Sequence, residues 1–113
     1  MENKTIEEGK TIAIIAYITI IGLIIAFVMN NEKKNEFASF HIRQSLGIII
    51  LSILISVFFF IIGFVISIPF LPTIINLLLI VLWVLGFIGA IQGEKKKVPV
   101  VGDQFQDWFK GVG

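Results

Sequence analysis

A single apolar run, residues 46–68, constrains this chain more than any other feature. It consists of Leu, Ile, Val and Phe, interrupted only by glycine and serine. As a helix it is about 34 Å long at about 1.5 Å per residue, enough to cross a hydrocarbon layer of about 30 Å. A helix of a water-soluble protein needs an apolar stripe, not apolar residues on every side. The run therefore predicts a membrane-spanning helix.

Composition supports the same class. The 113 residues are 57% hydrophobic, above ordinary globular usage. The absence of cysteine excludes disulfides and thiolate metal sites. A net charge of +1 gives no electrostatic case for a nucleic-acid partner. We expect one membrane domain over residues 11–113 after a polar tail over residues 1–10, and we expect no cofactor.

Two further apolar segments, residues 11–29 and 73–91, predict additional spans. The first is a retained anchor rather than a cleaved signal peptide, because its leading stretch is acidic and its apolar core is long. Two prolines within residues 69–72 predict a tight link between the second and third spans. The expected fold is an all-α transmembrane bundle of three spans.

Interfacial segments are expected beside the spans. Residues 37–45 predict a helical turn leading into the second span. Residues 103–110 place Phe105, Trp108 and Phe109 at helical spacing, which indicates an amphipathic helix in the interface plane, with Asp103 as its N-cap and Trp108 at headgroup depth. A frayed tail is the alternative.

Lysine and arginine are unevenly distributed between the two sides that three spans would create. One side carries Lys33, Lys34, Arg43, Lys95, Lys96, Lys97 and Lys110. Cytoplasmic loops are enriched in such residues, so three spans predict the N-terminus outside and the C-terminus inside the cell. The run Lys95–Lys97 either anchors the third span or binds anionic lipid headgroups.

Small and polar residues recur along one face of each span. These residues are Gly22 and Ala26 in the first span, Ser52, Ser56 and Gly63 in the second, and Gly86 and Ala90 in the third. They predict close helix packing, although the serines are also compatible with a narrow hydrated path. Asn76 is expected to form a hydrogen bond across a helix interface, with ligand binding as the alternative.

The segment Phe40–Gln44 is the best candidate for function. Arg43 could hold a phosphate or carboxylate through two hydrogen bonds, and His41 could titrate near neutral pH. Alternatively, Arg43 reaches lipid headgroups while His41 and Gln44 bond nearby backbone. No nucleophile elbow or phosphate-binding glycine loop is present, so we expect no enzyme activity.

The segment that includes Phe40, His41, Arg43 and Gln44 resembles the "FHxRQ" signature of import-component-like bacterial membrane proteins. Pro99 and Gly102 are similar to the tail of that family, which is related to the chloroplast inner-envelope import channel subunit. The resemblance implies a location in the bacterial cytoplasmic membrane and a link to protein translocation or insertion.

The sequence thus favours a non-catalytic subunit or accessory of a larger membrane complex. The bilayer and other membrane subunits, or further copies of the chain, are the expected partners. Two other classes remain open at this stage. One is a homo-oligomeric channel or small-solute transporter, and the other is an immunity protein that protects the membrane against a toxin.

Overall fold

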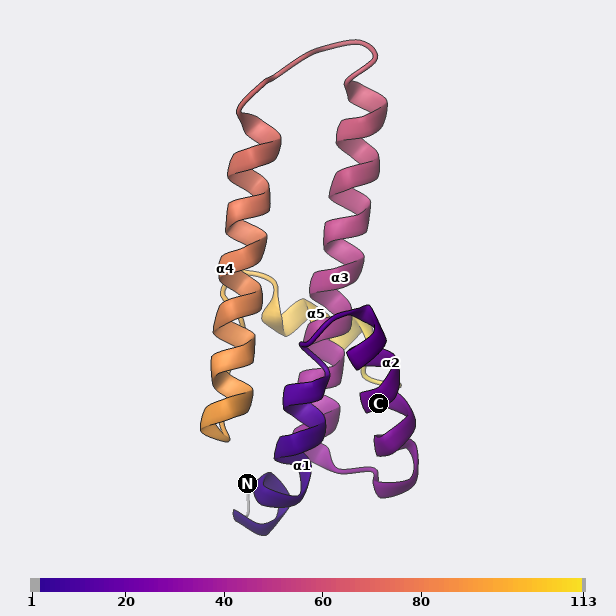
Figure 1. The fold of residues 1–113 in the computed structure, drawn as a ribbon, viewed down its shortest axis with the longest axis vertical. Coiled ribbons are helices and arrows are strands. Elements are labelled where there is room, and N and C mark those ends of the chain that lie inside the picture. Colours follow the sequence, from indigo (N-terminus) through magenta and orange to yellow (C-terminus); the bar gives the residue numbers. More distant parts are fainter. Residues whose placement is uncertain (1–2, 113) are drawn as a thin grey trace.

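The computed structural model describes residues 3–112, which form five helices. These are α1 (Asn3–Ile15), α2 (Ile20–Lys33), α3 (Glu36–Ile62), α4 (Leu71–Gln92) and α5 (Gly102–Trp108). The all-helical prediction is confirmed. Helices α3 and α4 form a long antiparallel hairpin, and α1, α2 and α5 gather around the half of it where α3 begins (Figure 1). The molecule measures 52 × 22 × 22 Å.

Helices α3 and α4 are long and apolar enough to cross a membrane. Only 17% and 22% of their most apolar windows are buried within the structure. A core helix of a soluble protein would cover most of such a window with other elements. Two of the three predicted spans are therefore present as candidate spans, and α4 matches its predicted range closely.

The first predicted span, residues 11–29, is wrong. The chain leaves helical structure after Ile15, and α2 then runs back beside α1 (Figure 1). Thr19 starts the new helix, because its φ of 146° departs from helical geometry and its side-chain oxygen accepts a hydrogen bond from the amide of Gly22. The prediction that the two termini lie on opposite sides of the membrane depended on three spans. Two spans do not imply it.

Helix α3 differs from prediction at its C-terminal end. Residues 37–45 are helical and lead directly into the span, as expected, and the helix begins after the N-cap Asn35. The helix ends at Ile62, although the apolar run extends to residue 68. Pro69 disfavours helical geometry at Ile68, within the non-helical segment that follows. The expected tight link is therefore a longer loop over residues 63–70.

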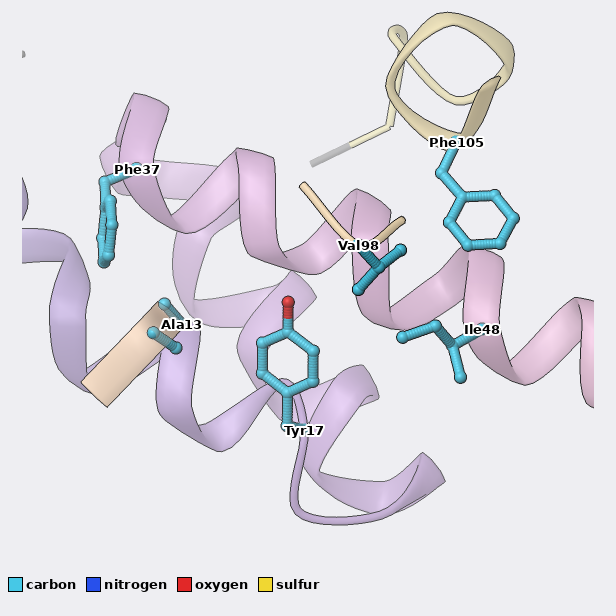
Figure 2. Packing of buried hydrophobic residues seen from close by; sticks show 7 residues of the cluster. Ala13, Tyr17, Phe37, Ile48, Val98 and Phe105 are labelled. Carbon is cyan, nitrogen blue, oxygen red and sulfur yellow. The ribbon is translucent and has the colours of Figure 1, made fainter. Parts of the chain in front are cut away.

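Helix α5 packs against α3, at the end of the hairpin where α3 begins. Phe105 is buried on Gly47, where any side chain would overlap the phenylalanine ring. Figure 2 shows Phe105 beside Ile48 and Val98 next to α3. Trp108 is 69% exposed. Asp103 lies inside the first turn and pairs with Lys97 at 2.6 Å; the N-cap position is taken by Val101.

Candidate functional site

The candidate site is a line of three buried polar side chains. His41 and Gln44 lie on the first turns of α3, and Tyr17 lies at the α1–α2 junction. The side-chain nitrogen of Gln44 lies 3.0 Å from the hydroxyl of Tyr17. That hydroxyl lies 2.7 Å from Nδ1 of His41, and Nε2 of His41 lies 2.8 Å from the carbonyl oxygen of Glu94. All three side chains are buried. They connect the α1–α2 junction to the segment that follows α4.

The partners fix the direction of these hydrogen bonds. A backbone carbonyl can only accept, so Nε2 of His41 carries the proton and donates to Glu94. In the neutral ring Nδ1 then accepts from the Tyr17 hydroxyl, which in turn accepts from Gln44. Burial raises the pKa of the Tyr17 phenol, which favours retention of the proton that it donates.

Gln44 and His41 together hold residues 93–101, here called the strap, against α3. Besides Tyr17, the nitrogen of Gln44 donates to the carbonyl oxygen of Lys96 at 3.0 Å. Its oxygen accepts from the amide of Val98 at 2.9 Å. A glycine in α4 makes room for this arrangement, since a Cβ at Gly86 would lie 2.8 Å from the Tyr17 ring. Figure 2 shows the hydroxyl of Tyr17 pointing toward α3 and the strap.

Side chains also bond the backbone carbonyls at the break between α1 and α2. The hydroxyl of Ser45 donates to the carbonyl oxygen of Ala16. The indole nitrogen of Trp83, from α4, donates to the carbonyl oxygen of Tyr17 at 2.7 Å. Helix ends leave carbonyls without partners, and away from water such groups must be bonded by protein. Ser45 and Trp83 therefore allow the helix to break where it does.

A second buried polar cluster organises the turn between α2 and α3. The side chain of Asn30 donates to the hydroxyl of Ser39 at 2.9 Å and accepts from the amide of Asn35 at 2.9 Å. Asn35 donates to the carbonyl oxygen of Thr5 at 2.8 Å, which attaches the start of α1. Sequence reasoning missed this cluster, since its asparagines stand in an otherwise ordinary hydrophilic turn.

The structure buries most of the predicted segment Phe40–Gln44, which lies in the first turns of α3. His41 and Gln44 bond backbone, which agrees with the second of the two interpretations. The ring of Phe40 is buried, with the ammonium of Lys95 5.7 Å from its centroid. Nε of Arg43 donates to the carbonyl oxygen of Val112 at 2.9 Å. Among the lysines of the strap, Lys97 pairs with Asp103, and the side chain of Lys96 is exposed.

The small residues of the predicted stripes divide into two groups. The buried group is Gly22, Ala26, Gly86 and Ala90. Ser52 is half-buried and donates to the carbonyl of Ile48 in its own helix. Ser56 and Gly63 are exposed. Asn76 is exposed on α4, and its side chain makes no hydrogen bond to another described residue.

The chemistry of the site is structural. Every buried side-chain nitrogen or oxygen in the described part of the chain has a partner. No group of three His, Cys, Asp or Glu side chains converges among residues 3–112 in a way that could hold a metal ion. Buried polar side chains of α3, such as Gln44 and Ser45, hold backbone segments in place.

Comparison with known proteins gives a consistent assignment. The model of the magnetosome magnetite crystal formation protein family matches residues 8–105. The UPF0132 membrane protein MJ1527 of Methanocaldococcus jannaschii is 36% identical over 83 residues, covering 70% of this chain and 55% of that protein. The UPF0132 membrane protein MJ1443 of the same organism is 36% identical over 76 residues, covering 64% and 63%. This chain thus spans less than two thirds of either relative. No solved structure matches.

These matches overturn the resemblance to import-component-like proteins and to the chloroplast import channel. The motif that suggested it, Phe40 to Gln44, serves here to bond the backbone of the strap.

Replacement of Ser45 by alanine tests the role of the site in bonding the helix break. The Ser45→Ala variant leaves the Ala16 carbonyl without its partner, so we expect a loss of about 1–3 kcal/mol in the free energy of unfolding. Ser56→Ala is the matched control on the exposed part of α3, with an expected change within about 0.5 kcal/mol. Unfolding in mixed micelles, followed by circular dichroism, measures both. Equal stability of the two variants would contradict this role.

Proposed function

The chain belongs to the magnetosome magnetite crystal formation protein family, and from that premise we propose that it is a non-enzymatic subunit of an assembly within the membrane. It is a small membrane protein. The α3–α4 hairpin provides the contact surface of the proposed assembly. The partner is a transmembrane helix of another subunit or of a second copy of the chain.

One observation carries this proposal. Asn76 is exposed on α4, within a groove between α3 and α4 that has a volume of about 330 Å³. Ser52 and Trp83 also line the groove, among aliphatic residues. No described residue forms a hydrogen bond with the side-chain amide of Asn76. Exposure of an unpaired polar group to hydrocarbon costs free energy. A helix from another chain that filled the groove would supply that partner.

The remaining features are consistent with a non-enzymatic role. The buried polar groups of α3 are bonded within the chain, and most of the large exposed apolar residues lie on α3, α4 and α2. Magnetite formation is not proposed for this chain, because that description concerns the family and no metal-binding cluster converges among residues 3–112. Of the serines on α3, Ser45 donates to the carbonyl oxygen of Ala16 and Ser52 to that of Ile48.

We further infer the orientation from charge. Every lysine and arginine lies before residue 46 or after residue 92, and in a two-span hairpin these segments share one side. Cytoplasmic segments are enriched in such residues. The half of the molecule that contains α1, α2, α5 and the strap therefore faces the cytoplasm of a cytoplasmic membrane, and the loop over residues 63–70 lies on the opposite side.

Replacement of Asn76 by leucine tests the assembly. An interhelical hydrogen bond is worth about 0.6–2 kcal/mol, so Asn76→Leu should weaken association by about 3- to 30-fold. Thr73→Val, at an exposed position on the same helix, should leave association unchanged. The size and subunit composition of the protein after gentle extraction measure the association. A lone monomer in every native extract would contradict the proposal.

Single cysteines test the orientation, since the natural chain contains none. With a membrane-impermeant maleimide on intact cells, Ser67→Cys should be labelled, whereas Asn3→Cys and Gly111→Cys should be labelled only after the membrane is opened. Labelling at Asn3→Cys but not at Gly111→Cys in intact cells would instead restore the three-span topology.

A further inference from the structure

A basic cavity of about 710 Å³ opens between the end of α2, the start of α3 and residues 110–112. Four cationic side chains line it, namely Lys34, Arg43, Lys95 and Lys110. The single carboxylate in its lining is that of Glu36. The one ion pair among the described residues lies elsewhere, between Lys97 and Asp103, so these four cations have no anionic partner within residues 3–112. The cavity is therefore suited to an anion.

Arg43 is the most firmly positioned of the four. Its Nε donates to the carbonyl oxygen of Val112, which fixes the plane of the guanidinium. The two terminal nitrogens make no hydrogen bond to any described residue. A guanidinium held in this way can donate two parallel hydrogen bonds to a phosphate group. Lys95 is also oriented, since its ammonium lies 5.7 Å from the centroid of the Phe40 ring.

An apolar slot of about 250 Å³ continues from this cavity. Its lining is wholly apolar and consists of Leu23, Ile24, Phe27, Ile42, Leu46 and Val112. Phe27 and Val112 line both the cavity and the slot, so the two spaces adjoin. Together they form a groove between α2 and α3 that is basic at one end and hydrocarbon-like at the other.

The basic and apolar ends of the groove are ordered along the molecule as the headgroup and acyl chains of a membrane lipid are. Helix α2 runs toward the end of the molecule at which α3 begins and α4 ends, here called the charged end, and α3 runs away from it (Figure 1). Leu23 and Leu46 therefore lie farther from the charged end than Lys34 and Ser39 do. The basic end thus lies at the membrane surface and the slot at acyl-chain depth, whichever face of the membrane the charged end occupies.

We propose that this groove binds one anionic phospholipid. The phosphate lies in the cavity against Arg43, with Lys34, Lys95 and Lys110 around the headgroup, and one hydrocarbon chain lies in the slot. The cavity volume is in the range of small-molecule sites. Because the site joins α2 and the C-terminal residues to α3, the bound lipid attaches peripheral elements of the fold to the spanning hairpin.

Lipid binding to the purified full chain in detergent, followed by native mass spectrometry, tests the site. The probes are phosphatidylglycerol and phosphatidylcholine with the same acyl chains. The double variant Lys95→Gln/Lys110→Gln should bind phosphatidylglycerol about tenfold more weakly. The matched control, Lys33→Gln/Lys96→Gln, loses the same charge from positions outside the cavity and should bind as the natural chain does. Equal weakening in both variants, or no preference over phosphatidylcholine, would overturn the proposal.

Two further arms separate a lipid from a free anion. Leu46→Trp fills the slot without changing the charge, so it should weaken phosphatidylglycerol binding at least severalfold while the protein stays folded by circular dichroism. Inorganic phosphate at millimolar concentration should not displace the lipid. Full displacement by inorganic phosphate, or unchanged lipid affinity in a folded Leu46→Trp variant, would show that no acyl chain occupies the slot and would overturn the lipid assignment.

Discussion

Backbone groups that are removed from water must be bonded, and this requirement shapes one end of the molecule. The non-helical segments there include residues 16–19 and the strap. Outside helices and closed barrels, the protein itself must supply the partners of such segments at membrane depth. The first turns of α3 supply them through His41, Gln44 and Ser45, with Trp83 of α4 contributing one more.

The same few side chains therefore hold both the segment before α3 and the segment after α4 in place. Gln44 contacts the α1–α2 junction through Tyr17 and the strap through Lys96 and Val98. The segments before α3 and after α4 thus form one packed unit, which leaves the distal half of the hairpin uncovered. The structure divides into a bonded, charged end and an exposed apolar hairpin. The proposed lipid site belongs to the first and the proposed assembly groove to the second.

The sequence predicted the parts of the fold that depend on hydropathy. Helix α4 and most of α3 were predicted from apolar runs that are long enough to span a membrane. Helix α5 was predicted from the helical spacing of its aromatic residues. The break at residues 16–19 could not be predicted this way, because residues 11–29 are as apolar as a true span. The available signal was local: Tyr17 places a hydroxyl within the run, and Thr19 can cap a new helix.

The candidate site, like the fold, could be predicted from the sequence only in part. His41 and Gln44 were identified because polar side chains beside an apolar run require partners. Their partners, the carbonyls of Glu94 and Lys96, could not be identified, since backbone acceptors leave no trace in the sequence. Tyr17, Asn30 and Asn35 were missed for a related reason, because their role depends on burial that arises only when α1 packs on α3.

Hydrogen exchange at the amide of Val98 tests most directly whether α3 bonds the strap. In the natural chain this amide donates to Gln44, so the account predicts slow exchange there despite the absence of regular secondary structure. In a Gln44→Leu variant, exchange at Val98 should accelerate while the amides of α4 stay protected. Rapid exchange at Val98 in the natural chain, or protection that persists without Gln44, would contradict the account.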